Sequence, residues 1–239
     1  MEVVLFSLII LIASILQTST GFGFSILATP FLLLLFGVTE AIQINLILSL
    51  IISGALVRKI WKDVDTGVLK RLIIGSAAGM PIGIIFFLSV NLDNLKLGIS
   101  ILIILLTILL IFNFRIEQTT GRDLIFGGLS GGLTTSIGMP GPPLLLYFAG
   151  TNTGKEKLRA TTLAFYLWIY SASLLLQVLF AGTNKTIWIS SALALPLVLI
   201  GLVAGQLLFH KINQQYFRLI VYAILLFTGV YLFIENWHL

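Results

Sequence analysis

An apolar run from Val3 to Val38 is broken in its middle by Gln17-Thr18-Ser19-Thr20-Gly21-Phe22-Gly23-Phe24-Ser25. As one straight helix the run would measure about 54 Å, whereas the hydrocarbon core of a bilayer is about 30 Å thick. The run must therefore turn or break, and the glycines and hydroxyl residues at its centre mark the place. Since non-helical backbone at membrane depth is stable only where protein or water covers it, we expect the break to line a cavity.

The same pattern returns in the second half of the chain, at Leu133-Thr134-Thr135-Ser136-Ile137-Gly138-Met139-Pro140-Gly141-Pro142-Pro143. The threonine-serine-x-glycine part of this stretch lies at a constant offset of 117 residues from that of the first. Two broken apolar segments at corresponding positions of two halves are the best sequence indication of a transporter's binding site. We therefore expect both breaks to contribute to one site.

The composition is that of a polytopic membrane protein. Hydrophobic residues make up 58% of the chain and charged residues 10%, with a mean hydropathy of +1.10. Nothing outside the apolar segments is long enough to form a soluble core, so we expect residues 1–239 to be one all-α transmembrane domain in contact with membrane lipid. The first apolar segment carries Glu2 where a signal peptide would be basic, and we expect it to be part of the mature protein.

Composition also excludes several function classes. The lysines and arginines lie between apolar segments rather than in a basic stripe, so we expect no nucleic-acid partner. The chain has no cysteine, which excludes disulfides and thiolate metal sites. His210 and His238 are isolated at the end of an apolar segment and near the C-terminus, so we expect no metal site and no other cofactor.

Three further apolar segments follow the first break. They run from Ala41 to Val57, from about Lys70 to Val90, and from Leu95 to Phe114, and residues 58–65 form a basic loop between the first two. The second of them contains Gly79-Met80-Pro81-Ile82-Gly83, whose small residues four positions apart permit close helix approach.

The second half repeats this order. Its broken element covers Leu124 to Gly150, a helix begins near Lys155, and spans follow from Ile187 to Phe209 and from Tyr216 to Ile234.

Other matches extend the repeat along nearly the whole chain. At an offset of 122 residues, Gly79-Met80-Pro81-Ile82-Gly83 corresponds to Gly201-Leu202-Val203-Ala204-Gly205. At the same offset, Asn91 corresponds to Asn213 and Lys96 to Arg218. We therefore expect two internal repeats, residues 1–117 and 118–239.

The positive-inside rule distinguishes two topologies. If all eight segments span the membrane, the 14 lysines and arginines divide eight against six between the two sides. If each broken element is a re-entrant hairpin, they divide twelve against two, with only Lys96 and Lys185 outside. This favours two inverted repeats in the cell membrane, each a re-entrant helical hairpin followed by three transmembrane helices, with both termini outside. A broken but fully spanning helix is the alternative.

The early Gly-Phe-Gly-Phe-Ser after Thr-Ser, paired with the mid-chain Ser-Ile-Gly-Met-Pro-Gly-Pro-Pro, resembles the sulfite exporter TauE/SafE family of membrane permeases. The resemblance covers both halves and the overall length. It implies a transporter of small sulfur-containing anions such as sulfite or organosulfonates, and it leaves the particular substrate open.

Candidate substrate-binding residues fall in two groups. Free backbone N–H groups at the ends of broken helices, with the positive helix dipole behind them and hydroxyls beside them, suit an oxyanion. The first group therefore lies at the breaks: Thr18, Ser19, Gly21, Phe22, Gly23, Thr135, Ser136, Gly138 and Gly141. The second group lies on the helices that follow: Gln43, Asn45, Arg159, Thr161, Thr162 and Tyr166.

Each group has a structural alternative. Serine, threonine and glycine at the breaks could pack helices closely or bond back to the preceding turn. The second-group polar residues could form interhelical hydrogen bonds, and Arg159 could be an ordinary positive-inside residue rather than a counter-charge for the substrate.

All nine acidic residues lie in loops or at segment ends, which argues against a cation substrate and a carboxylate relay. The sequence therefore predicts a secondary transporter, by default an exporter, that holds a small anion between the two breaks by alternating access. A permease for another small anion is the nearest alternative. The second alternative is an intramembrane enzyme, but the chain offers no base placed near the hydroxyls, so we expect no catalytic residue. The third alternative is a membrane scaffold that does not transport. The oligomeric state is not indicated.

Overall fold

The structure is a computed structural model of the whole chain. It describes residues 2–89, 117–151 and 153–211, together with isolated helical positions within 101–108 and 216–234. The spans predicted from Leu95 to Phe114 and from Tyr216 to Ile234 fall mostly outside the described residues, as do the matches of Asn91 with Asn213 and of Lys96 with Arg218.

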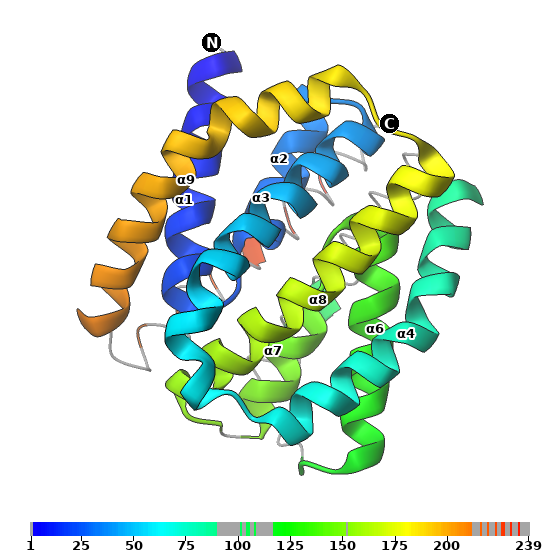
Figure 1. The fold of residues 1–239 in the computed structure, drawn as a ribbon, viewed down its shortest axis with the longest axis vertical. Coiled ribbons are helices and arrows are strands. Elements are labelled where there is room, and N and C mark those ends of the chain that lie inside the picture. Colours follow the sequence, from blue (N-terminus) through cyan, green and yellow to red (C-terminus); the bar gives the residue numbers. More distant parts are fainter. Residues whose placement is uncertain are drawn as a thin grey trace.

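Every regular element among the described residues is helical, as the all-α prediction requires. The elements, in chain order, are α1 (Glu2–Thr20), α2 (Phe24–Leu35), α3 (Val38–Ile60), the 3-10 helix η1 (Trp61–Asp63), α4 (Thr66–Ser89), α6 (Thr120–Ile137), α7 (Gly141–Gly150), α8 (Lys155–Ala181) and α9 (Lys185–Lys211). They form the bundle in Figure 1. Five of them, α1, α3, α4, α8 and α9, contain stretches long and apolar enough to cross a membrane.

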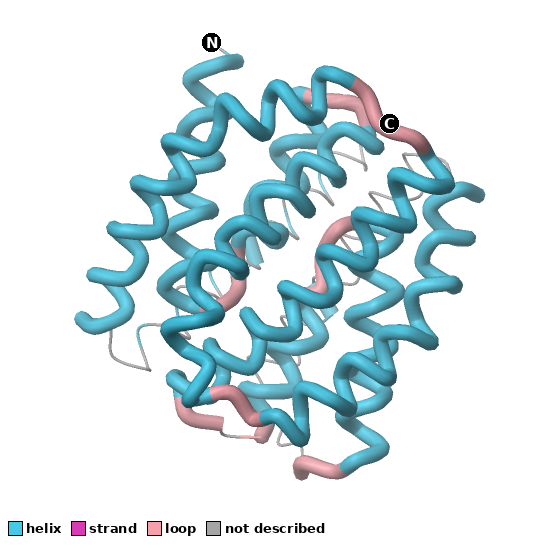
Figure 2. The backbone as a smooth tube through the Cα atoms, in the orientation of Figure 1, coloured by secondary structure: helices cyan, strands magenta, loops and turns pink. Residues whose placement is uncertain are grey.

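The first broken element folds back on itself. At its base, the ring of Phe6 early in α1 packs edge-on against that of Phe36, which follows α2, with 5.7 Å between the centroids. At its tip, the chain reverses through residues 21–23, which lie in the interior of the bundle (Figure 2). The element is therefore a helical hairpin rather than a continuous helix.

The second broken element is a hairpin of the same kind, formed by α6 and α7. Tyr147 near the end of α7 donates a hydrogen bond to Asp123 near the start of α6, so the two ends of the element lie together. Its tip, residues 138–140, is the other interior loop in Figure 2. In Figure 1 the two hairpins enter the bundle from opposite ends.

The helix starts lie a few residues earlier than the sequence suggests, because polar residues cap them. Helix α6 begins at Thr120, since the hydroxyl of Thr119 accepts a hydrogen bond from the N–H of Arg122. Helix α3 begins at Val38 rather than at Ala41, and in its first turn the carboxylate of Glu40 accepts a hydrogen bond from the N–H of Gly37.

The two glycine steps, Gly79–Gly83 on α4 and Gly201–Gly205 on α9, pack closely against other helices, as predicted. Each faces the hairpin of the other half of the chain. A Cβ on Gly79 or Gly83 of α4 would overlap the carbonyl of Gly128 or Gly132 on α6. On α9, a Cβ on Gly205 would lie 2.7 Å from the carbonyl oxygen of Ile15 on α1. The two halves are therefore joined by helices in near backbone contact.

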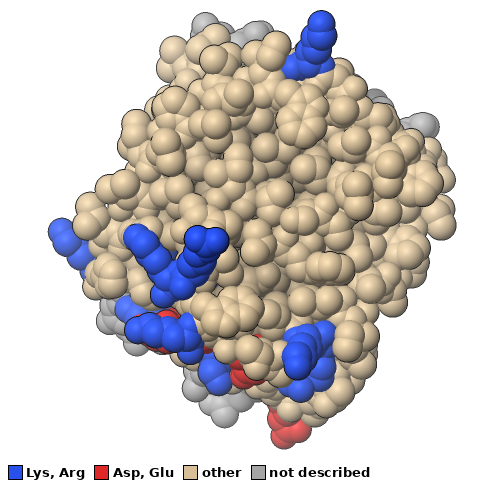
Figure 3. All heavy atoms as spheres, viewed as in Figure 1, with Lys and Arg blue, Asp and Glu red and all other residues tan. Residues whose placement is uncertain are grey.

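Charge is concentrated at one end of the bundle. Apart from Lys185 at the start of α9, every described lysine and arginine belongs to the ends of α3 and α9, to η1, or to the starts of α4, α6 and α8. Figure 3 shows such side chains gathered over the lower part of one face, with a largely uncharged surface above them. We call this the basic end.

Candidate functional site

The first hairpin tip is held by a buried arginine. Arg159, in the first turns of α8, has only 6% of its surface exposed, and its Nε donates a 2.8 Å hydrogen bond to the carbonyl oxygen of Thr18. Gly21 passes so close to α8 that a Cβ there would lie 3.0 Å from the Cα of Arg159. Arg159 therefore holds the tip from α8, and it is a buried residue of the basic end rather than an exposed one.

The second tip is held in a corresponding way by side-chain amides. Nδ2 of Asn45 on α3 donates a 2.8 Å hydrogen bond to the carbonyl oxygen of Gly138. Nε2 of Gln177 on α8 donates a 2.9 Å hydrogen bond to the carbonyl oxygen of Thr135. Each tip thus has its end-of-helix carbonyls fixed by donors from neighbouring helices, which leaves helix N-termini rather than C-termini available to a ligand.

The two hairpins pass one another along α8. Thr18 is bonded to α8 at the level of Arg159, and Thr135 is bonded to α8 at the level of Ser173 and Gln177, further along the helix. Between these levels the starts of α2 and α7 meet, since a Cβ on Gly141 would lie 3.1 Å from both Ile26 Cδ1 and the hydroxyl oxygen of Tyr166. The positive ends of two half-helices therefore converge beside Tyr166.

An aromatic wall closes this central region. The rings of Phe22 and Tyr166 pack edge-on with 6.2 Å between centroids, and the ring of Tyr170 lies 4.9 Å from that of Tyr166. All three side chains are fully buried. A ligand here is shielded from water, so hydrogen bonds to it act in a low-dielectric environment.

Three of the predicted hydroxyls bond to their own helices. The hydroxyl of Ser19 donates to the carbonyl of Leu16, that of Thr135 to Gly131 and that of Ser136 to Gly132. Since a hydroxyl carries one proton, these groups have no donor left for an anion in this conformation.

Four other predicted residues keep free donors. The hydroxyls of Thr18, Thr162 and Tyr166 and the Nη2 of Arg159 are buried and have no hydrogen-bond partner among the described residues. Arg159, Thr162 and Tyr166 share one face of α8, since they lie three and four residues apart. Buried polar atoms are nearly always paired in native proteins, so the three unpaired donors on one face of α8 indicate a ligand site, whereas the side chain of Thr18 packs against Gly205 of α9.

One family of known proteins matches the chain along nearly its whole length. Residues 6–232 match the family model described as sulfite exporter TauE/SafE. The chain belongs to this family. Membership implies a membrane transporter of sulfur anions such as sulfite, and the family consists of transporters rather than enzymes. No curated protein and no solved structure matches the chain.

In this TauE/SafE family member, Gln43 and Thr161 are already hydrogen-bonded to other groups, and Gly23 and Gly141 contribute backbone only. Nε2 of Gln43 donates a 2.7 Å hydrogen bond to the carbonyl of Gly182 at the end opposite the basic end. Thr161 accepts a 3.0 Å hydrogen bond from the N–H of Asp65, so it joins α8 to the loop before α4. Gly23 begins α2 with a left-handed φ of 108°, and Gly141 begins α7.

The prolines of the second tip reduce the number of backbone N–H donors that it can offer to a ligand. Pro142 and Pro143 stand in the first turn of α7, where a helix normally presents free N–H groups, and proline has none. The start of α2 carries no proline in its first turn and no side-chain cap. The anion-binding capacity of the backbone is therefore greater at the first tip.

Sequence reasoning missed several residues that shape the site. Gln17, Tyr170, Ser173 and Gln177 are fully buried and contact the tips or their helices. Buried glutamines are rare in apolar helices, and this is the signal that could have identified Gln17 and Gln177.

One acidic residue, Asp123, is buried more deeply than its place in the sequence indicates. Asp123 stands near a helix end, as the sequence indicates, yet its side chain is fully buried between Arg71 and Tyr147. It lies at the base of the second hairpin rather than at its tip. No group of histidines, cysteines and acids in the described part of the chain is arranged to hold a metal ion.

Proposed function

We propose that this protein is a secondary transporter that exports small sulfur-containing oxyanions, such as sulfite or organosulfonates, by alternating access. The observation that supports this best is the set of buried, unpaired donors on Arg159, Thr162 and Tyr166 of α8, with the Tyr166 hydroxyl beside the converging starts of α2 and α7. Donors without acceptors suit a ligand that offers only acceptors, and an oxyanion is such a ligand.

Charge favours the same conclusion. Arg159 is buried, and none of the described acidic side chains forms an ion pair with it. A buried cation without a counter-charge is costly, and a bound anion would remove that cost. Arg159 therefore attracts an anion to the first tip and holds it there by charge-assisted hydrogen bonding.

The symmetry of the two hairpins supplies a route for alternating access. Gly21 and Gly138 each donate their N–H over 2.8 Å to the carbonyl four residues earlier, and Gly37 and Gly154 begin α3 and α8 with nearly the same backbone angles. These pairs are related by the offset of the repeat. In the proposed cycle the inverted repeats exchange conformations, so that the site opens first to the basic end and then to the opposite end.

The driving force in this proposal is the membrane potential. No described carboxylate is hydrogen-bonded or ion-paired to Thr162, Tyr166 or Arg159, so none is placed to carry a proton with an anion bound by these three residues. An inside-negative potential supplies roughly 2.3 kcal/mol per charge per 100 mV for the exit of a monoanion.

Sulfite flux in proteoliposomes containing the purified protein tests the proposal. We expect voltage-dependent flux, and we expect Tyr166→Phe and Thr162→Val to weaken sulfite affinity by about tenfold, because each removes one hydrogen bond of about 0.5–3 kcal/mol to a charged ligand. Ser136→Ala is the matched control, since its hydroxyl is already bonded to Gly132. Equal affinities in all three variants, or strict dependence on a proton gradient without a response to voltage, would contradict the proposal.

A further inference from the structure

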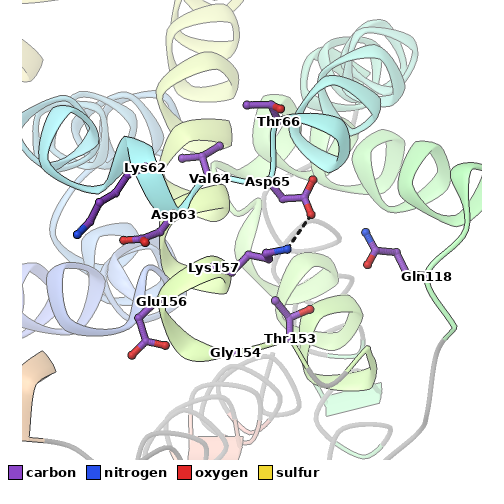
Figure 4. A pocket seen from close by; sticks show the side chains of 10 residues that line it. All are labelled: Lys62, Asp63, Val64, Asp65, Thr66, Gln118, Thr153, Gly154, Glu156 and Lys157. Atoms are coloured by element: carbon purple, nitrogen blue, oxygen red, sulfur yellow. Dashed lines mark hydrogen bonds and ion pairs between the residues drawn. The ribbon is translucent and has the colours of Figure 1, made fainter.

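Two neighbouring pockets open at the basic end. The larger, of about 790 Å³, is lined by loops from both halves and is drawn in Figure 4. The charged residues of its lining are Lys62, Asp63, Asp65, Glu156 and Lys157. Three acids against two lysines make this pocket unfavourable for an anion.

One acid of this pocket is firmly ionised. Although partial burial favours the neutral form of Asp65, hydrogen bonds from the N–H of Val68 and from Lys157 outweigh it and hold the pKa of this carboxyl below its usual value. The ion pair with Lys157, at 3.2 Å, is the dashed line in Figure 4. The lysine is therefore neutralised and does not attract a second anion.

The smaller pocket has the opposite character. It measures about 360 Å³ and lies between the end of α3, the start of α8 and the end of α9. Besides Lys62, Asp63 and Glu156, which it shares with the larger pocket, its polar lining consists of Lys59, Arg159, Gln206 and His210. Its charged lining is thus three cations (Lys59, Lys62 and Arg159) against two acids (Asp63 and Glu156), an excess of one positive charge where the larger pocket has an excess of one negative charge.

Arg159 connects this pocket to the first hairpin tip. It lines the pocket, while its Nε is bonded to the carbonyl of Thr18 and its Nη2 is buried without a partner among the described residues. The ring of Phe209, which also lines the pocket, lies over the guanidinium with 4.3 Å between Cζ and the ring centroid. A cation–π contact of this kind orients the guanidinium without neutralising it.

We propose that this smaller pocket is a loading site for small oxyanions at the basic end, separate from the site beside Tyr166. In it Lys59 supplies the outer charge, Gln206 a hydrogen-bond donor and Arg159 the inner charge. Arg159 is shared by both sites, so an anion passes from the loading site to the tip without leaving its guanidinium. The proposal deepens the transport function proposed above and depends on it for its second step.

The test compares sulfite uptake by vesicles of the two opposite orientations. Lys59→Gln is expected to raise the half-saturating sulfite concentration about two- to fivefold when sulfite is supplied at the basic end, because an exposed charge contributes modestly. No change is expected when sulfite is supplied at the other end. Lys70→Gln is the matched control, since Lys70 is exposed at the same end and does not line the pocket. Equal effects of Lys59→Gln from both ends, or equal effects of the two variants, would overturn the proposal.

Direct binding separates this proposal from the transport function. Sulfite binding to the purified protein in detergent is expected to weaken in Lys59→Gln, to be lost in Arg159→Gln, and to persist in Tyr166→Phe at the loading site. If the wild-type protein carries no sulfite across a bilayer but shows this pattern of binding, the transport function fails and the loading site stands. If Tyr166→Phe abolishes binding and Lys59→Gln leaves it unchanged, the loading site is wrong.

Discussion

Gly21 and Gly138 end the first helix of each hairpin in the same left-handed conformation, with φ of 81° and 73°. An L-residue in this conformation costs about 1–2 kcal/mol, so the glycines are needed for backbone reasons alone. Gly138 has a second reason, because a Cβ there would lie 2.8 Å from Nδ2 of Asn45, the group that holds the tip.

Three alanine variants separate strain from lack of space. Gly138→Ala is expected to lower the thermal stability of the detergent-solubilised protein most, because it meets both strain and a clash. Gly182→Ala should cost about 1–3 kcal/mol from backbone strain alone, since Gly182 has a φ of 75° and a ψ of −176°, a combination almost confined to glycine, and open space around it. Gly121→Ala, with neither constraint, should be neutral. Equal melting temperatures for Gly138→Ala and Gly182→Ala would show that Asn45 adjusts freely to a Cβ at Gly138.

At the residue scale, the sequence located the two tips and the residues around them but did not show which side chains keep free hydrogen-bond donors. Thr18, Thr162 and Tyr166 keep free hydroxyls, while Ser19, Thr135 and Ser136 bond to the preceding turn. Sequence alone cannot separate these groups, because the choice depends on the rotamer and on what the neighbouring helix offers.

At the scale of elements, the base of the second hairpin is fixed by one buried carboxylate. Asp123 accepts hydrogen bonds from Nε of Arg71 on α4 and from the hydroxyl of Tyr147 on α7. It therefore ties both helices of the hairpin to a helix of the other half.

Asp123→Asn is expected to destabilise the protein by about 2–3 kcal/mol. Removing one partner of a fully buried ion pair costs about 3–5 kcal/mol of stability. The loss expected here is smaller, because the side chain of Arg71 is 32% exposed and can regain contact with water. Thermal unfolding in detergent measures the effect, and Glu117→Gln, at an exposed residue of the same end, provides the control. A loss of stability no larger than that of the control would show that the hairpin is held by helix packing alone.

Helix contacts between the halves could be anticipated only in part. The glycine steps on α4 and α9 predicted close approach, and this is confirmed. Their partners, α6 and α1, belong to the opposite halves of the chain. A local sequence pattern does not identify these partners, because small residues permit a close helix contact without specifying which helix makes it.

At the scale of the whole molecule, the all-helical fold and the family follow from the sequence, since composition, length and the repeated break all point the same way. The depth of each hairpin does not follow, because the positions of Thr18 and Thr135 along α8 are set by tertiary hydrogen bonds. The inverted arrangement relative to the membrane stays a prediction, which the distribution of charge supports.

Cysteine labelling tests that orientation cleanly in a chain without native cysteines. A cysteine replacing Asn184 should react with an impermeant thiol reagent from outside intact cells, whereas one replacing Asp63 should react only after permeabilisation, because the positive-inside rule predicts that the basic end faces the cytoplasm. Labelling of the cysteine at position 63 in intact cells would refute the predicted topology.

The central claim is that an anion binds between the hairpin tips, against Arg159, Thr162 and Tyr166. The most direct measurement is the anomalous difference map of a crystal of the protein grown with selenite, whose pyramidal oxyanion has the shape of sulfite and whose selenium scatters anomalously. We predict a selenium peak within hydrogen-bonding reach of the Tyr166 hydroxyl and the Arg159 guanidinium, beside the starts of α2 and α7. Occupied selenite sites elsewhere in the protein, with none between the tips, would contradict the account.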